Sequence, residues 1–220
     1  MVLLRKLLLR QKNTKPLLKN SKSDEKNLRL LCDVPSIPFY FIRHGETDWN
    51  KKQLCQGKND IPLNDNGIQS AYEAAKNFEN ISLDLIITSP LLRAKQTAEI
   101  ISNKVQVDFK VVSEFAERDF GELQGGSNLP MYEFEEQEIM GNISNKFMAM
   151  NIERLEDVQA RITKGLKDIL NPNSRVLIVS HGRLFLILCQ MLSINSMKQI
   201  SNTQSFLIKP ENDHWELALT

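Results

Sequence analysis

Short apolar runs typical of strands alternate with helical patterns along most of this chain. This alternation limits the folds that the chain can adopt. Four runs have the length and the aliphatic or aromatic content of buried strands: PFYFIR (38–43), LDLIITS (83–89), FKVVS (109–113) and SRVLIVS (174–180). Helices are expected between them, over residues 67–80, 91–103 and 153–170. Because strands separated by helices favour a parallel sheet covered on both faces, we predict an α/β fold, a three-layer αβα sandwich with a mainly parallel sheet in a single domain.

Charge is unevenly distributed, and the first part of the chain differs in charge from the rest. Residues 1–23 contain seven Lys or Arg and no acidic residue, whereas the whole chain has 28 Lys and Arg against 27 Asp and Glu. The remainder is therefore acidic, which gives no reason to expect a nucleic-acid partner. We expect residues 1–36 to form a basic N-terminal extension, mobile or a short helix, with organelle targeting as the alternative, and residues 37–220 to form the catalytic domain.

The cysteines and the apolar runs indicate the compartment. Cys32, Cys55 and Cys189 are far apart, are odd in number and show no metal-ligand spacing. The longest apolar run, RLFLILCQML, is far shorter than the roughly 20 residues of a membrane span. These features predict a cytoplasmic protein without an integral membrane segment.

Polar residues follow the expected strands. Arg43 and His44 end the first strand and His181 follows the last, although the chain has only three histidines. Arg93 opens the helix after the second strand, and Glu117 follows the third. Each residue alone is more often structural, but the carboxyl ends of parallel strands meet at one edge of a sheet. We therefore expect these five side chains to gather there.

Together these residue types suit phosphoryl chemistry. Two guanidiniums can clamp a phosphoryl group bidentately, and two imidazoles can flank it. A neutral imidazole can attack phosphorus, which divides a difficult displacement into two easier steps. One carboxyl group remains to move protons.

The motif RHGETDWN (43–50) resembles that of the histidine phosphatase superfamily, which contains cofactor-dependent phosphoglycerate mutases and many small phosphatases. The resemblance extends over about residues 38–220. It implies that His44 becomes phosphorylated, that Arg43 and Arg93 bind the phosphoryl oxygens, that His181 hydrogen-bonds them, and that Glu117 is the general acid and base. It further implies that the pocket is lined by Asn50, Gln56, Gly57 and Gly182.

Two features near the expected pocket stay open. Arg183 follows the second His-Gly and is either a surface residue at a helix start or a ligand for a second anionic group of the substrate. Residues 126–151 are expected to cap the pocket, and their MYEFEEQE segment carries four glutamates. These glutamates either form a solvated helix face or, if they lie over the pocket, disfavour highly anionic substrates.

The choice between phosphatase and mutase depends on details of the resemblance. SPLLRAKQTA (89–98) resembles the phosphatase form of its motif. ERDFGELQG (117–125) resembles a mutase motif, but Phe120 replaces its Tyr, and Asn128 stands where mutases carry a substrate-binding Lys. The insertion that carries a further Arg pair in mutases is also missing. We therefore expect a metal-independent phosphomonoester hydrolase that needs no cofactor and acts on a small phosphorylated metabolite.

Two other functions are alternatives to this one. A cofactor-dependent phosphoglycerate mutase is the first alternative, and an inactive relative that binds a phosphorylated ligand or a protein partner is the second. Metal and serine hydrolases are disfavoured because the sequence has neither ligand spacing nor a Gly-x-Ser-x-Gly motif. The physiological substrate and the oligomeric state are left open.

Overall fold

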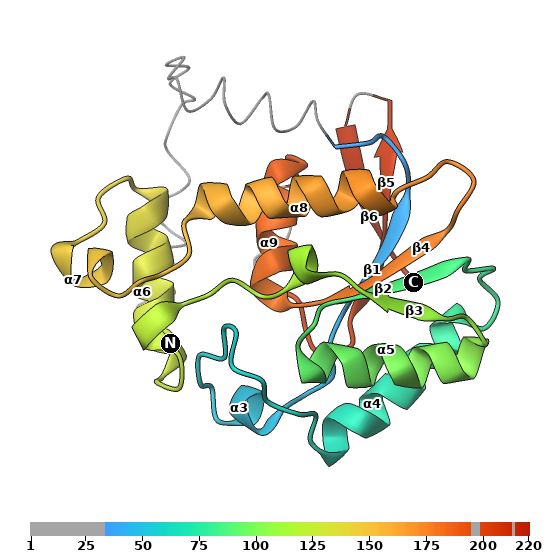
Figure 1. Ribbon diagram of the computed structural model, residues 1–220, viewed down its shortest axis with the longest axis horizontal. Helices are drawn as coiled ribbons and strands as arrows, with labels where there is room; N and C mark the ends of the chain where they lie inside the picture. Colours follow the sequence, from blue (N-terminus) through green and yellow to red (C-terminus); the bar gives the residue numbers. More distant parts are fainter. Residues whose placement is uncertain (1–33, 195–198, 213) are drawn as a thin grey trace.

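A computed structural model describes residues 34–194, 199–212 and 214–220. These residues form one six-stranded sheet with the order β3-β2-β4-β1-β5-β6 (Figure 1). The strands are β1 (Phe39–Arg43), β2 (Leu85–Thr88), β3 (Phe109–Val111), β4 (Val176–Ser180), β5 (Ser205–Glu211) and β6 (His214–Leu219). The first four are parallel to one another, whereas β5 and β6 are antiparallel additions. The predicted α/β fold with a mainly parallel sheet is confirmed.

Helices cover both faces of the sheet. They are α3 (Asp48–Lys51), α4 (Asp65–Ala75), α5 (Leu92–Val105), α6 (Asn128–Ile139), α7 (Asn145–Met148), α8 (Leu155–Ile169) and α9 (Gly182–Met191). In Figure 1, α8 and α9 lie on one side of the sheet and α4 and α5 on the other. The three layers follow from the apolar stripes of these helices, each of which needs a sheet face to bury against.

The alternation of side chains along β1 shows how the layers are joined. Phe39 and Phe41 are fully buried against α8 and α9, while Ile42 is buried in the cluster on the α4 and α5 side. The neighbouring strand β4 is buried at all five positions, as expected for a central strand covered on both faces. Such a two-sided core makes the sheet a rigid platform for the loops at its ends.

The helix boundaries differ from the predicted ones by a few residues. The α4 helix stops at Ala75 and continues as a short 3-10 turn over Lys76–Phe78, where the prediction ran on to residue 80. The two C-terminal strands were not predicted. None of the helices in the described parts of the chain is both long and apolar enough to cross a membrane.

The expected extension falls largely on residues 1–33, which lie outside the described residues. Val34 is already buried in the core cluster, so packing begins before the proposed boundary at residue 36. The boundary between extension and catalytic domain therefore stays a proposal.

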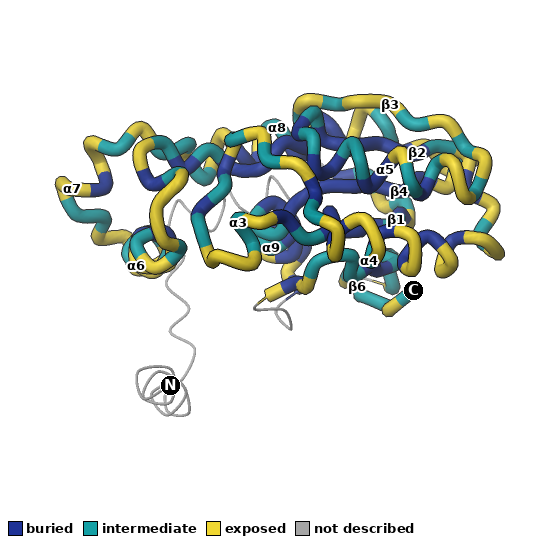
Figure 2. Tube along the Cα trace, turned by 90° about the horizontal axis from the view of Figure 1, so that it is seen from below, coloured by how far each residue is buried: buried dark blue, intermediate teal, exposed yellow. Residues whose placement is uncertain are grey.

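The segment between β3 and β4 extends beyond the sheet as a separate small layer. Figure 2 shows α6 and α7 at one end of the molecule, beyond α3. A third apolar cluster holds this layer, with Phe134 and Phe147 packed edge to face around Met131 and Phe120. We call the residues 126–151 the cap.

Candidate active site

A cavity of about 410 Å³ lies where the carboxyl ends of β1, β2 and β4 meet the cap. Among its lining residues are nine of the ten predicted site residues: Arg43, His44, Asn50, Gln56, Gly57, Arg93, Glu117, Gly182 and Arg183. The tenth, His181, is fully buried behind this wall. The structure thus brings together residues that are up to 140 positions apart in the sequence.

His44 lies at the end of β1, and its contact with Gly45 indicates its tautomer. Its Nδ1 atom is 2.6 Å from the carbonyl oxygen of Gly45, so Nδ1 must carry the hydrogen and Nε2 keeps its lone pair. Burial and the nearby Arg93 and Arg43 guanidiniums hold the pKa of His44 well below its usual value. The imidazole is therefore neutral at pH 7, which is the form that can act as a nucleophile.

Arg43 and Arg93 are held by backbone carbonyl groups. Arg43 donates from Nη1 to the oxygen of Ile200 at 2.6 Å, and Arg93 donates to Asn59 and Gly57 at 2.7 Å each. Burial lowers the pKa of both guanidiniums, to about 10 for Arg93, so both remain charged at pH 7. The Nε atoms of both side chains are buried without a hydrogen-bond partner. Two cations, Arg93 buried and Arg43 partly buried, each with an unpaired Nε donor, make a site for an anion.

His181 stands next to His44 with the ring centroids 5.2 Å apart. Its Nε2 is 2.6 Å from the hydroxyl of Ser89, whereas its Nδ1 is buried without a partner. Burial, with the Arg93 charge as the next cause, holds the pKa of His181 well below its ordinary value. Arg43 Nε, Arg93 Nε and His181 Nδ1 are the unpaired buried side-chain nitrogens of the described residues, and all belong to this one site.

Glu117 lies in the loop after β3 and is nearly buried. Its carboxylate accepts hydrogen bonds from the backbone nitrogens of Arg183 at 3.1 Å and Leu184 at 2.9 Å, in the first turn of α9. A carboxylate suits a helix N-terminus, whose free N–H groups carry partial positive charge. Glu117 is thereby fixed at the cavity wall.

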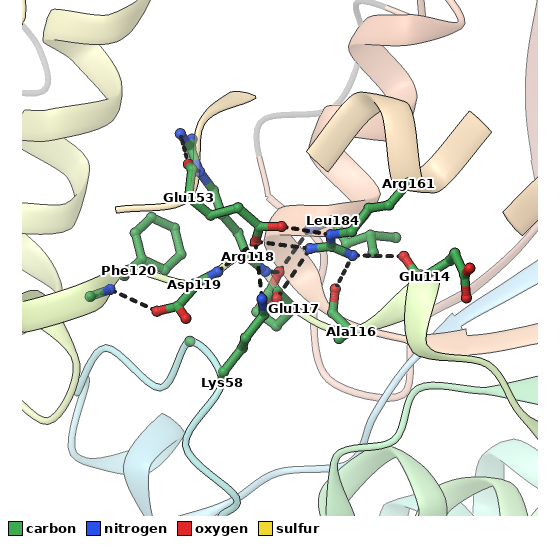
Figure 3. A network of polar contacts seen from close by, with 12 residues as sticks. Lys58, Glu114, Ala116, Glu117, Arg118, Asp119, Phe120, Glu153, Arg161 and Leu184 are labelled. Carbon is green, nitrogen blue, oxygen red and sulfur yellow. Dashed lines mark hydrogen bonds and ion pairs between the residues drawn. The ribbon is translucent and has the colours of Figure 1, made fainter. Parts of the chain in front are cut away.

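A second set of contacts, made by Arg161 and Arg118, holds the loop that carries Glu117 (Figure 3). Arg161 of α8 donates to the carbonyl oxygens of Ala116 at 2.6 Å and Glu117 at 3.2 Å, and it pairs with Glu153 at 2.8 Å. Arg118 donates both terminal nitrogens to Glu138 of the cap at 2.7 Å. The loop that carries Glu117 is therefore tied to both α8 and the cap.

The side-chain amides of Asn50 and Gln56 are oriented by Thr47. The Asn50 oxygen accepts from the backbone nitrogen of Thr47 at 3.1 Å, and the Gln56 oxygen lies 3.0 Å from the Thr47 hydroxyl. With their oxygens engaged, both amide nitrogens are left to donate toward an anion in the cavity. Gly57 serves differently, because its carbonyl oxygen holds Arg93.

The structure gives the positions of the two features that the sequence left open. Arg183 lines the cavity and contacts the cap, with its Nε 3.3 Å from Glu135 and its guanidinium 4.8 Å from the Tyr132 ring centroid. Of the four glutamates of MYEFEEQE, Glu133 and Glu136 are exposed. Glu135 and Glu138 are each paired with an arginine.

Sequence reasoning missed several residues at the site. Asn202, in the loop before β5, donates to the carbonyl oxygens of His44 at 3.0 Å and Gly45 at 3.1 Å, and it also lines the cavity. Tyr132, Leu186 and Gln199 line the cavity as well. They belong to no motif, so only the fold could reveal them.

Comparisons with known proteins show the family to which the chain belongs. The family model for the histidine phosphatase superfamily (branch 1) matches residues 39–220. The chain is 43% identical over 143 residues to the uncharacterized phosphatase PhoE of Bacillus subtilis, covering 64% of this chain and 69% of that protein. It is 33% identical over 152 residues to a probable phosphoglycerate mutase, GpmB, of Salmonella paratyphi A, covering 66% and 70%. The solved structure of Bacillus stearothermophilus YhfR matches with a TM-score of 0.70 and 25% identity, covering 83% of this chain and 96% of that one.

Proposed function

We propose that this chain, which belongs to the histidine phosphatase superfamily, hydrolyses small phosphomonoesters through a phosphohistidine formed on His44. The observation that carries the proposal is a neutral imidazole beside two guanidiniums whose Nε atoms are buried and unpaired. A nucleophile and a phosphoryl-binding site thus share one small cavity.

In the first step, the lone pair of His44 Nε2 attacks phosphorus, and the bond between phosphorus and the ester oxygen breaks. Arg43 and Arg93 neutralise the phosphoryl oxygens, and His181 Nδ1 donates to one of them if it carries the ring hydrogen. Glu117, the proposed general acid, gives a proton to the departing oxygen. The alcohol leaves, and a phosphohistidine remains.

In the second step, a water molecule attacks the same phosphorus. The Glu117 carboxylate takes the proton of this water, the bond between phosphorus and nitrogen breaks, and its electron pair returns to Nε2. Inorganic phosphate is released and Glu117 is protonated again. The Gly45 carbonyl, which accepts from Nδ1, keeps the same tautomer in place through both steps.

Hydrolysis is favoured over mutase activity by the composition of the cavity wall. Asn128, a neutral residue, lines the cavity where a mutase carries a lysine. A bisphosphorylated intermediate would then find less positive charge to retain it, so water has time to attack. Because two guanidiniums already supply the charge that a metal ion would bring, the proposed reaction needs no metal.

A panel of phosphomonoesters, measured with and without 2,3-bisphosphoglycerate and with EDTA present, tests this proposal. We expect phosphate release that the bisphosphate does not stimulate and that EDTA does not reduce. Mutase activity that required the bisphosphate and exceeded hydrolysis would reassign the protein to the mutase alternative. Binding of phosphate esters without any turnover would support the inactive relative.

A further inference from the structure

Arg183 is a charged residue of the cavity wall that the proposed reaction does not use. It lies in the first turn of α9, where its backbone nitrogen donates to Glu117. Its side chain is only 20% exposed and leaves the helix toward the cap. Arg183 therefore connects the turn that holds Glu117 to the cap along the cavity wall.

Two contacts with α6 of the cap fix the plane of this guanidinium. Its Cζ atom lies 4.8 Å from the centroid of the Tyr132 ring, and its Nε is 3.3 Å from Glu135 Oε1. The Tyr132 ring lies against one face of the guanidinium, and Glu135 contacts its Nε. The edge formed by the two terminal nitrogens is therefore the one that an anion can approach. A guanidinium edge matches the two oxygens of a carboxylate.

The surrounding carboxylates do not cancel the Arg183 charge. Glu138 is bound by Arg118 through both of its oxygens, and Glu133 and Glu136 are exposed. Burial raises the pKa of Glu135 to about 7, even though Arg183 and Arg118 act to lower it. Near neutral pH, Glu135 is thus only partly ionised and compensates Arg183 incompletely.

We propose that Arg183 determines substrate specificity by binding a carboxylate on the leaving group. The preferred substrates are then small phosphomonoesters of hydroxy acids, with the phosphoryl group at Arg43 and Arg93 and the carboxylate at Arg183. A second phosphate suits the position less well, because it would place more negative charge beside Glu117 and Glu135. This inference rests on the proposed function, since it assigns the other end of the same substrate.

The test compares two substrates that differ only at the proposed contact. In 3-phosphoglycerate a carboxylate stands where glycerol 3-phosphate has a hydroxymethyl group. A hydrogen-bonded charge pair of this kind is typically worth roughly a tenfold to hundredfold difference, so we expect the wild type to show such a ratio of kcat/KM values. Arg183→Met, which keeps the length and removes the charge, should bring this ratio close to one.

A matched control comes from Arg154, an exposed arginine that pairs with Glu156 on the outer surface. Arg154→Met should leave the ratio unchanged. Glu135→Gln should raise it, because the competing carboxylate is gone while a hydrogen-bond acceptor stays beside Nε. A wild-type ratio near one, or a ratio that Arg183→Met does not change, would overturn the inference. A loss of equal size for both substrates would do the same, since Arg183 would then act only through Glu117.

Failure of the proposed hydrolysis is distinguished by a binding measurement. In the His44→Ala background, which cannot form a phosphohistidine, calorimetry gives the affinities of both compounds without turnover. Tighter binding of 3-phosphoglycerate that disappears with Arg183→Met supports the carboxylate site even if no substrate is hydrolysed. Equal affinities of the two compounds would contradict it, whatever the activity.

Discussion

Gly182 lies so close to Arg43 that a side chain on the glycine would crowd the arginine. A Cβ atom at Gly182 would be 3.3 Å from Arg43 Nε and 3.5 Å from Cζ, a separation that obliges the guanidinium to shift by a few tenths of an ångström. The Nε atom is one of the unpaired donors of the proposed phosphoryl site. The missing side chain of Gly182 therefore leaves room for Arg43 at the proposed phosphoryl site.

We predict that Gly182→Ala separates activity from stability. Alanine favours a helix over glycine by up to about 1 kcal/mol, so the Tm should be unchanged or slightly higher. The value of kcat/KM should fall at least tenfold because Arg43 is displaced. Thermal unfolding and steady-state kinetics check the two halves, and a variant with full activity would show that Arg43 tolerates the shift.

Glu117→Gln should affect substrates according to their leaving groups. An alkoxide is expelled slowly without protonation, whereas nitrophenolate leaves readily, and general acid help is worth about 10² to 10⁴ in rate. The variant should lose the first step for alkyl phosphates and largely keep it for p-nitrophenyl phosphate. Stopped-flow absorbance should then show a burst of one nitrophenol per site, because the water step still lacks its base.

Equal losses for both substrates, with no burst, would move the acid to another residue such as Glu122 or Glu46. The substitution also replaces an oxygen that accepts backbone hydrogen bonds from α9, so a Tm measurement must accompany the kinetics. A loss of stability without a leaving-group effect would mean that Glu117 serves the helix rather than the reaction.

The ion pair between the buried Arg118 and the partly exposed Glu138 should stabilise the cap. The Arg118 side chain is 2% exposed and also packs over the rings of Phe120 and Phe134. Removing one partner of a fully buried pair typically costs about 3 to 5 kcal/mol because the other charge is left unpaired, and the partial exposure of Glu138 sets this as an upper limit here. Arg118→Met should therefore destabilise strongly, and adding Glu138→Gln should recover part of the loss.

Urea denaturation of the single and double variants gives the coupling energy of this pair. The exposed pair of Arg154 and Glu156 is the control, with a coupling of about 0 to 1 kcal/mol. If the two couplings were equally small, the cap would be held by its apolar cluster alone.

The lowered pKa of His44 predicts how the free energy of unfolding depends on pH. The pKa of His44 is held well below 6.5 in the folded protein, so between pH 7.5 and 5.5 the unfolded chain takes up a proton that the folded protein does not. The free energy of unfolding should therefore fall as the pH drops through 6.5, by about 1.4 kcal/mol from this group. His44→Asn should lose about that much less over the same interval. An identical pH dependence in both proteins would mean that His44 protonates in the fold.

The sequence predicted, for physical reasons, the edge of the sheet at which the candidate site residues gather. Arg43 and His44 follow a strand whose apolar run is unambiguous, and the repeated His-Gly after β4 indicates the neighbouring strand. Parallel strands bring their carboxyl ends together whatever the details of packing. The placement of these residues in one cavity therefore depended only on the strand and helix pattern.

The elements that the sequence did not reveal have weak or nonlocal signals. Strand β5 (SFLIKPE) contains Pro210, which lies past the part that pairs with β1, and β6 is mostly half-exposed. Asn202 reaches His44 from 158 positions away, and its neighbours in the sequence form no motif. The position of Arg183 was undecided because it depends on Tyr132 and Glu135, which only the folded cap brings near.

The central claim is that His44 carries the phosphoryl group during turnover, and quenching the reaction under alkaline conditions tests it most directly. With p-nitrophenyl phosphate in excess, peptide mass spectrometry of Glu117→Gln, in which the second step is slow, should find one phosphate on His44. The phosphate should be lost on acid treatment and absent from His44→Ala. Phosphate on another residue such as Ser180, or hydrolysis by a protein that is never phosphorylated, would contradict the account.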